Sequence, residues 1–285
     1  MNEMKKLNVG STLLNKIFKS KKSTLVSKIL ELGKTIEDPE RMFSFSGMRE
    51  DLSELLDSSQ TNEEKLYANY YLSMIYSKSY DYESEIISHS TIALELNATL
   101  KKLNQEQVFS LNHRLYEAYS EFNEHQNALE YLQAAIANAN HRTQNEVSNL
   151  IALKAACFHE VGRYKEALQL NKEILSNPDL EEIKHLILNN LANNSYELGL
   201  MEDAEHYLKE MSKTDCGYPE DTFINKFNSI FQLAVLKFEL GEIEKSTNLF
   251  QQRLKLAIGY GDCDYIEEAE IDIQQLYEKQ LSQQN

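Results

Sequence analysis

The chain has 285 residues, a formal net charge of −16, and only nine glycines and three prolines. So few turn-forming residues leave little room for β-hairpins, and the acidic balance argues against nucleic-acid binding by the chain as a whole. No stretch approaches the ~18 consecutive apolar residues of a membrane-spanning helix. The three cysteines form no CxxC pair, so they suggest neither a disulfide framework nor a zinc site. No continuous apolar run follows the N-terminal lysines, and we therefore expect a reduced, cytoplasmic protein.

Positive charge is concentrated at the N-terminus. Residues 1–34 hold eight lysines against two glutamates, which gives +6 for this segment and −22 for the remainder. Such asymmetry can mark a basic arm that contacts nucleic acid or an acidic protein surface. The candidate contacts are Lys19, Lys21, Lys22 and Lys28. The alternative is a solvated, lysine-rich helix face.

The first predicted helices are short. Residues 12–20 and 24–32 have helical patterns, and we expect Gly33 to end the second of them. Residues 48–57 carry apolar residues at helical spacing, and the polar run that follows places a domain boundary near residue 60. From residue 63 onward the pattern predicts antiparallel helix pairs, at 63–79 with 82–99, 104–122 with 125–139, 144–161 with 164–176, 180–198 with 201–212, and 221–240 with 243–259. A last helix at 264–281, polar on its outer face, would cap the stack.

Four of these pairs repeat one arrangement of small and aromatic residues, in which a small residue in each helix lets the two backbones approach closely. The four copies are Leu115-Tyr116-x-x-Tyr119 with Ala128, Leu132 and Ala135; Ala155-x-x-Phe158 with Gly162, Tyr164 and Ala167; Leu191-Ala192 with Gly199 and Ala204; and Leu233-Ala234 with Gly241 and Phe250. Self-similarity of this kind predicts an α-solenoid. A solenoid offers an extended concave surface, so its default function is to hold another chain.

These motifs resemble the tetratricopeptide repeat (TPR), most clearly at 152–170 and 188–208. The resemblance implies an all-α fold, a right-handed TPR superhelix over 61–285 with a C-terminal capping helix, behind a short helical N-terminal module at 1–60. The family period is about 34 residues, but Ala167 follows Ala128 by 39 residues and Ala204 follows Ala167 by 37. The longer helices resemble those of the peptide-pheromone receptors of Gram-positive bacteria and their phages, the Rap–NprR–PlcR–PrgX group and the arbitrium receptors.

That resemblance implies a short peptide in the concave groove and an N-terminal module that passes the signal on. Residues 12–30 loosely resemble the last two helices of a helix-turn-helix, with Lys21 and Lys22 at the start of the recognition helix. Asn15 and Lys16 stand where that motif needs a small residue, so a divergent cap or a partner-binding bundle is the alternative. The function implied is a cytoplasmic peptide receptor that regulates transcription or a signalling partner. A constitutive TPR adaptor for a protein partner is the alternative, and a homodimer stays open.

The repeat register predicts which side chains line the groove. Asn189 and Asn193 lie one helical turn apart, and asparagine offers both a donor and an acceptor to the backbone of an extended peptide. Phe231 and Phe238 would form a neighbouring apolar anchor. The candidate peptide-binding residues are Asn149, His159, Asn189, Asn193, Tyr196, Asn228, Phe231 and Phe238. The alternatives are a solvated helix face for the asparagines and core positions for the phenylalanines.

The sequence contains no pattern typical of catalysis. The seven histidines include no HExxH and no metal-ligand spacing. No glycine-rich phosphate loop is present, and residues 259–262 are expected to form a helix stop. Paired carboxylates are common, as they must be in a chain this acidic. We therefore expect no enzyme activity, no cofactor and no bound metal.

Overall fold

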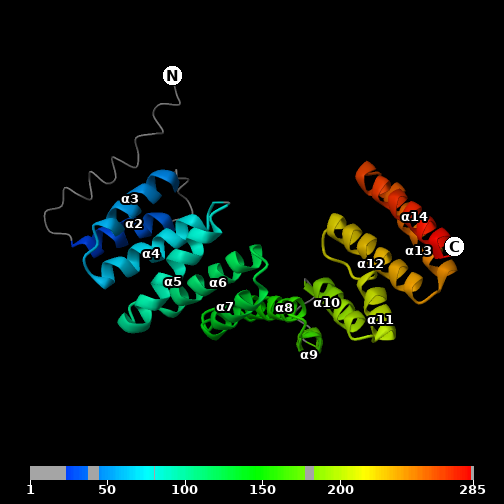
Figure 1. Cartoon of the computed structure of the whole chain (residues 1–285), viewed down its shortest axis with the longest axis horizontal. Helices are drawn as coiled ribbons and strands as arrows, with labels where there is room; N and C mark the ends of the chain where they lie inside the picture. Colours follow the sequence, from blue (N-terminus) through cyan, green and yellow to red (C-terminus); the bar gives the residue numbers. More distant parts are fainter. Residues whose placement is uncertain (1–23, 38–44, 80, 177–182, 284–285) are drawn as a thin grey trace, which may run out of the picture. The chain divides into compact units, whose positions relative to one another are not determined.

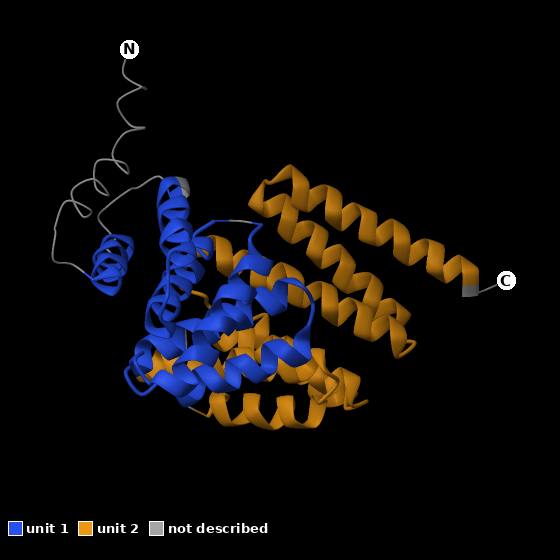
Figure 2. Cartoon of the chain, turned by 60° about the vertical axis from the view of Figure 1, so that its left-hand side comes forward, with its two compact units in different colours: residues 1–142 blue, residues 143–285 orange. Residues whose placement is uncertain are grey.

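The computed structural model describes residues 24–37, 45–79, 81–176 and 183–283 (Figure 1). All the regular elements of this described part are helices. The chain divides into two compact units, residues 1–142 and 143–285 (Figure 2). The all-α prediction is thereby confirmed for the described residues.

The first unit contains a run of consecutive helices, each in contact with a neighbour. They are α2 (Leu25–Glu37), α3 (Phe45–Asp57), α4 (Asn62–Tyr76), α5 (Glu83–Leu100), α6 (Gln105–Glu121) and α7 (His125–Ala137). Both α2 and α3 pack on α4, and α4 to α7 pack in sequence. Ile29, Leu52 and Leu72 share one buried core, so the described part of the N-terminal segment is covered by the first helix pair. The domain boundary near residue 60 stays a prediction.

The second unit continues the helix pairs. Its elements are α8 (Gln144–Glu160), α9 (Tyr164–Leu175), α10 (Lys184–Glu197), α11 (Met201–Met211), α12 (Pro219–Glu239), α13 (Ile243–Tyr260) and α14 (Cys263–Gln283). Each of these helices packs on the next one. From α4 onward, the observed bounds agree with the predicted ones to within a few residues. Residues 12–20, predicted helical, and the first residues of the helix predicted at 180–198 lie outside the described chain.

Local sequence signals fix where the helices begin. Thr61 starts α4, Asn104 starts α6 and Thr143 starts α8 with a capping box, in which the cap side chain accepts from the backbone N–H three residues on. The Glu or Gln at that third position accepts from the N–H of the cap residue in return. Two of the free N–H groups of each helix start are satisfied in this way.

The turns inside four of the helix pairs share one geometry. Gly162, Gly199 and Gly241 adopt the left-handed conformation with φ between 72° and 74°, and Asn123 takes the equivalent place with φ of 56°. The N–H of Gly199 donates to the carbonyl of Tyr196 at 2.9 Å, and the next N–H donates to Ser195 at 2.8 Å. This is the Schellman arrangement, which favours glycine or asparagine because a side chain is strained there. Gly261 ends α13 in the same conformation, as predicted.

Gly33 corrects one prediction. It does not end a helix but lies buried inside α2, which continues to Glu37. A Cβ added at Gly33 would lie 2.0 Å from Cζ of Tyr71 on α4. The glycine is therefore needed for the close approach of two helices and not for a turn.

The last helix is attached through a buried arginine. Arg253 on α13 is 1% exposed and pairs with Glu268, at 2.6 Å, and with Asp272, both on α14. Its Nε donates to the carbonyl of Phe227 on α12 at 3.2 Å, and its guanidinium lies over the Phe227 ring. These contacts join α12, α13 and α14, which are the last three helices in Figure 1.

Candidate functional site

A cavity of about 150 Å³ lies among α10, α11 and α12. Three of the predicted groove residues line it, namely Asn193 and Tyr196 from α10 and Phe231 from α12. The complete lining is Ala192, Asn193, Tyr196, Ala204, Leu208, Phe231, Gln232, Val235 and Leu236. The repeat register therefore places two neighbouring first helices so that their side chains meet at one site.

The cavity has an apolar floor and a partly polar rim. Ala192, Ala204 and Leu208 are at most 4% exposed and belong to the core between the helix pairs. The small residues Ala192 and Ala204 let α10 and α11 approach closely, as the repeat motif predicts. Tyr196 at the rim is 38% exposed. The site can therefore receive an apolar group from solvent and offer it polar neighbours.

Asn189 and Asn193 differ in their hydrogen bonding. Nε2 of Gln232 donates to Oδ1 of Asn189 at 3.1 Å, which connects α10 to α12. The side-chain amide of Asn193, which is partly exposed, has no hydrogen-bond partner among the described residues. Asn193 can therefore offer a donor and an acceptor to a ligand, whereas Asn189 orients Gln232.

Tyr196 is held by an acidic neighbour. A hydrogen bond to Glu239 at the end of α12 raises the pKa of the Tyr196 hydroxyl, and partial burial and the charge of Glu197 act in the same direction. The hydroxyl thus stays protonated and donates to the carboxylate. Two carboxylates beside Tyr196 make this end of the cavity acidic.

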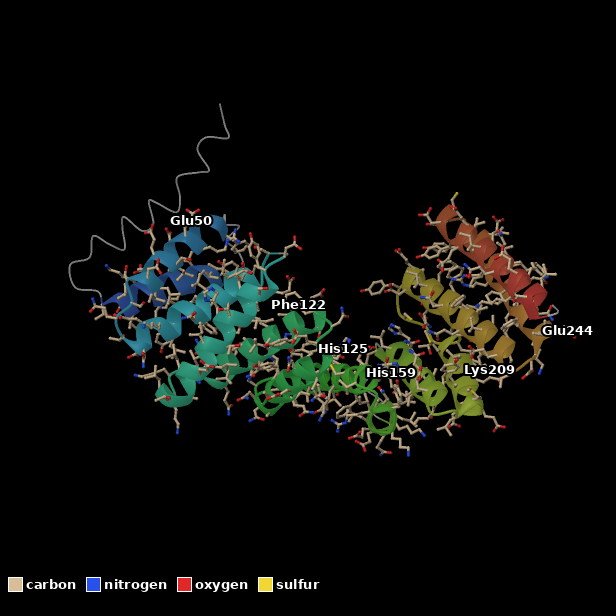
Figure 3. The ribbon with its side chains drawn as sticks, in the orientation of Figure 1. Glu50, Phe122, His125, His159, Lys209 and Glu244 are labelled. Atoms are coloured by element: carbon tan, nitrogen blue, oxygen red, sulfur yellow. The ribbon has the colours of Figure 1, made fainter. Side chains whose placement is uncertain are left out.

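His159 on α8, which is labelled in Figure 3, contacts α10 through the buried Asn194. Its Nδ1 lies 3.1 Å from Oδ1 of Asn194, while Nδ2 of Asn194 donates to the carbonyl of Asn190. Since Oδ1 can only accept, Nδ1 of His159 carries the proton. His159 therefore has a partner within the protein and does not line the cavity.

The first unit contains the same arrangement. His89 on α5 lies 2.8 Å from Oδ1 of Asn69 on α4, and Nδ2 of Asn69 donates to the carbonyl of Lys65. Burial lowers the pKa of His89, so its neutral form is favoured. The sequence analysis did not anticipate these asparagine–histidine pairs, because the partners lie 20 residues apart in one case and 35 in the other.

Three further candidates lie away from the cavity. Asn149 on α8 and Asn228 on α12 are exposed, and neither lines it. Phe238 is partly buried against a cluster made by Ala234, Phe250 and Leu276. Phe231 packs against the same cluster, and a binding role for Phe238 stays a prediction. Gln232, which the sequence analysis did not single out, does line the cavity.

A buried lysine fixes the helices behind the site. Nζ of Lys237 on α12 lies 2.6 Å from Glu205 on α11 and 3.0 Å from Glu242 at the start of α13. Burial opposes the charge of Lys237, but the two hydrogen bonds outweigh it and raise the pKa of this lysine. Lys209, which is labelled in Figure 3, also pairs with Glu205 and, together with Lys237, lowers the pKa of that carboxyl.

Of the lysines proposed for partner contacts, only Lys28 can be placed. It lies on α2 and is partly buried. Lys19, Lys21 and Lys22 fall outside the described residues, as does the helix-turn-helix resemblance that depends on them. The basic-arm hypothesis stays a prediction.

The described residues contain neither a metal-binding cluster nor a membrane-spanning helix. No group of three His, Cys, Asp or Glu side chains there could hold a metal ion. None of the helices described is both long and apolar enough to span a bilayer.

No protein-family model and no curated protein sequence matches the chain. Solved structures do match it. The apo form of RapI has a TM-score of 0.63 at 15% identity, covering 96% of this chain and 85% of its own. The apo form of the quorum sensor NprR from B. thuringiensis has a TM-score of 0.58 at 17% identity, covering 96% and 76%. BtubC from P. vanneervenii has a TM-score of 0.54 at 14% identity, covering 84% and 94%.

Identities this low show the fold alone. The helix pairs, the left-handed turn residues and these structural matches agree in showing that the chain has the fold of the TPR solenoid proteins.

Proposed function

We propose that the protein is a cytoplasmic peptide receptor that binds a short extended peptide at the cavity among α10, α11 and α12. The observation that carries the proposal is the lining of this cavity. It combines the unpaired amide of Asn193 with the aromatic side chains of Tyr196 and Phe231 on an apolar floor. Peptide binding needs both kinds of group, because amides pair with the backbone and apolar surface anchors a side chain.

The fold likeness supports the same class of function. One of the similar structures, NprR, is a quorum sensor. By analogy, binding in this chain would regulate transcription or a signalling partner, with the lysine-rich residues that precede α2 as the output element. Peptide binding would then favour one of two conformations of the chain, as linkage requires.

Selection from a library of random hexapeptides tests the proposal. The library is mixed with purified protein, complexes are separated by size exclusion, and retained peptides are identified by mass spectrometry. Titration calorimetry then measures the affinity of a retained peptide. The Asn189→Ala, Asn193→Ala double variant should bind about 10-fold to 1,000-fold more weakly, because Asn193 contributes up to two hydrogen bonds of about 0.5–1.5 kcal/mol each and Asn189 orients Gln232 for a third.

Asn248→Ala serves as the matched control, since Asn248 is an exposed asparagine on α13, outside the cavity lining. Its affinity should equal that of the wild type. A folded double variant that binds with unchanged affinity would move the site elsewhere. A library from which nothing is retained would count against the receptor function itself.

A constitutive adaptor is the second candidate. Another cavity, of about 240 Å³, is lined by Leu168, Leu198 and Leu200 with Lys165, Lys172 and Gln169. Leu200 is 43% exposed. Apolar residues beside two lysines suit an acidic protein segment. A large partner that is retained in a pull-down, insensitive to added peptide and lost in Leu200→Glu, would support this candidate.

A further inference from the structure

The cavity lining includes a buried acceptor without a donor. Oε1 of Gln232 has no hydrogen-bond partner in the described chain, although the atom is shielded from solvent. The other end of the same amide is used, because Nε2 donates to Oδ1 of Asn189. Buried acceptors are almost always paired, and a donor from a bound molecule would complete the pairing of this atom.

The size of the cavity limits what can bring that donor. A space of about 150 Å³ with apolar walls is able to hold one group of the size of benzene. Leu208, Val235 and Leu236 supply aliphatic contacts, and Phe231 supplies an aromatic one. One apolar side chain, from leucine to phenylalanine in size, fits this space.

The rim restricts the occupant further. Asn193 has a free amide on the opposite helix, which can donate to a carbonyl oxygen. Glu239 and Glu197 lie beside Tyr196 and disfavour an acidic side chain by repulsion. A residue within an extended peptide has the matching groups, namely a backbone N–H, a carbonyl and a side chain between them.

We propose that this cavity, in a protein that functions as the peptide receptor described above, selects one apolar residue of the bound peptide. Its side chain fills the space among α10, α11 and α12, and its backbone N–H donates to Oε1 of Gln232. Asn193 donates to the carbonyl of the same residue or of a neighbouring one. The cavity thus specifies both a side-chain class and a backbone amide.

Small probes test the selection of the apolar side chain and the hydrogen bond to Gln232 separately. N-acetyl-leucine N-methylamide carries the side chain and the N–H, and its binding is followed by methyl NMR of the full chain. The matching compounds with glycine and with aspartate lack the apolar side chain. We expect each to bind at least about 10-fold more weakly, from the apolar area that leucine buries. In an ester analogue of the leucine probe, oxygen replaces the N–H of the leucine residue itself. Comparison of the two probes isolates the hydrogen bond from this N–H to Oε1 of Gln232.

The ester should bind wild-type protein about 5-fold to 100-fold more weakly than the amide, because it leaves Gln232 Oε1 unpaired. In Gln232→Leu the acceptor is gone, and the two probes should bind equally. Val235→Phe should fill the cavity and abolish binding of both probes. Circular dichroism verifies that the variants fold, and if Gln232→Leu does not, the amide-to-ester ratio on the wild type decides.

Equal binding of amide and ester to the wild type would overturn the role of Gln232. Equal binding of the leucine and glycine probes would overturn the apolar selectivity. Either result would leave the receptor function standing if the library still yields peptides. Failure of the library together with failure of all probes would instead remove the receptor function.

Discussion

Gly33→Ala should destabilise the first unit, although alanine is the better helix former. Gly33 lies in the middle of α2, and a Cβ there would meet Cζ of Tyr71 at 2.0 Å and both Cε atoms at 2.4 Å. The Tyr71 ring is 3% exposed and packs edge-on against Tyr70 at 4.9 Å. It cannot move aside without disturbing the core, so the two helices must separate.

The magnitude follows from two opposing effects. Alanine gains about 1 kcal/mol over glycine inside a helix, while overpacking costs about 1–3 kcal/mol. A rigid, buried ring gives a cost near the upper limit, so we expect a net loss of about 2 kcal/mol in the free energy of unfolding of this unit. Gly47→Ala is the matched control, because nothing lies within 4 Å of a Cβ at Gly47 on α3. That substitution should stabilise by up to about 1 kcal/mol.

Urea unfolding followed by hydrogen exchange of the α2 and α4 amides measures both variants. Amides of these helices are the right probes because solenoids need not unfold in one step. In a Tyr71→Leu background the cost of Gly33→Ala should largely vanish, giving a coupling energy of at least about 1 kcal/mol. If Gly33→Ala stabilises as much as Gly47→Ala, the packing of α2 against Tyr71 is wrong.

Three more predictions concern other parts of the chain. Ala167→Leu and Ala204→Leu, at positions at most 1% exposed, should each cost about 1–3 kcal/mol in urea unfolding, whereas the exposed Ala98→Leu should change little. Burial, then repulsion from neighbouring glutamates, raises the pKa of Asp51 to about 6, above the ordinary value of 3.8. The folded state therefore binds the proton of the Asp51 carboxyl more tightly than the unfolded state does. Protonation of Asp51 accordingly stabilises the fold increasingly as pH falls from above 6 toward 4. Asp51→Asn should accordingly raise the melting temperature at about pH 7, with a gain that disappears near pH 4; an equal gain at both would contradict the assignment. Deleting residues 1–22 should leave peptide binding intact and abolish any salt-sensitive binding to duplex DNA, and unchanged DNA binding would show that the lysine-rich start is not the contact.

The helix pairs could be predicted because their signals are local. A capping box such as Thr143 with Glu146 lies within four residues of the chain. A turn glycine such as Gly199 is recognised by its fixed spacing after the Leu191-Ala192 pair of the same repeat. Gly33 shows where this reasoning stops. A glycine that ends a helix and a glycine that admits a neighbouring ring look alike in sequence, and only Tyr71, 38 residues further on, separates them.

The packing of α2 determines which deletion can test the basic segment, residues 1–34. Removing all of residues 1–34 would delete Ile29 and Leu32, which are at most 1% exposed in the first core. Lost output would then report a damaged fold. A deletion that stops before α2 removes most of the excess lysines and leaves that core in place.

The candidate site could be predicted only in part. Three residues that the helical period assigns to the groove, Asn193, Tyr196 and Phe231, line one cavity. Phe238 lies seven residues after Phe231, and both pack against the cluster of Ala234, Phe250 and Leu276, but Phe238 does not line the cavity. A helical period gives the direction of a side chain but not which neighbouring helix covers it. Gln232 was missed for the same reason, since its importance comes from Asn189 on another helix.

Polarity within a first helix is therefore insufficient evidence for a ligand site, as three asparagines of α10 show. Asn194 is buried and already uses both ends of its amide, with His159 and with the carbonyl of Asn190. A ligand at Asn194 would have to break a bond that the fold needs. Asn193 lies one residue earlier, and its amide is unpaired. Asn189 accepts a hydrogen bond from Nε2 of Gln232, while Oε1 of Gln232 has no donor. A peptide bound at this cavity, as we propose, would gain hydrogen bonds from Asn193 and Gln232 while the protein would lose none, so the free energy of those bonds would go to affinity.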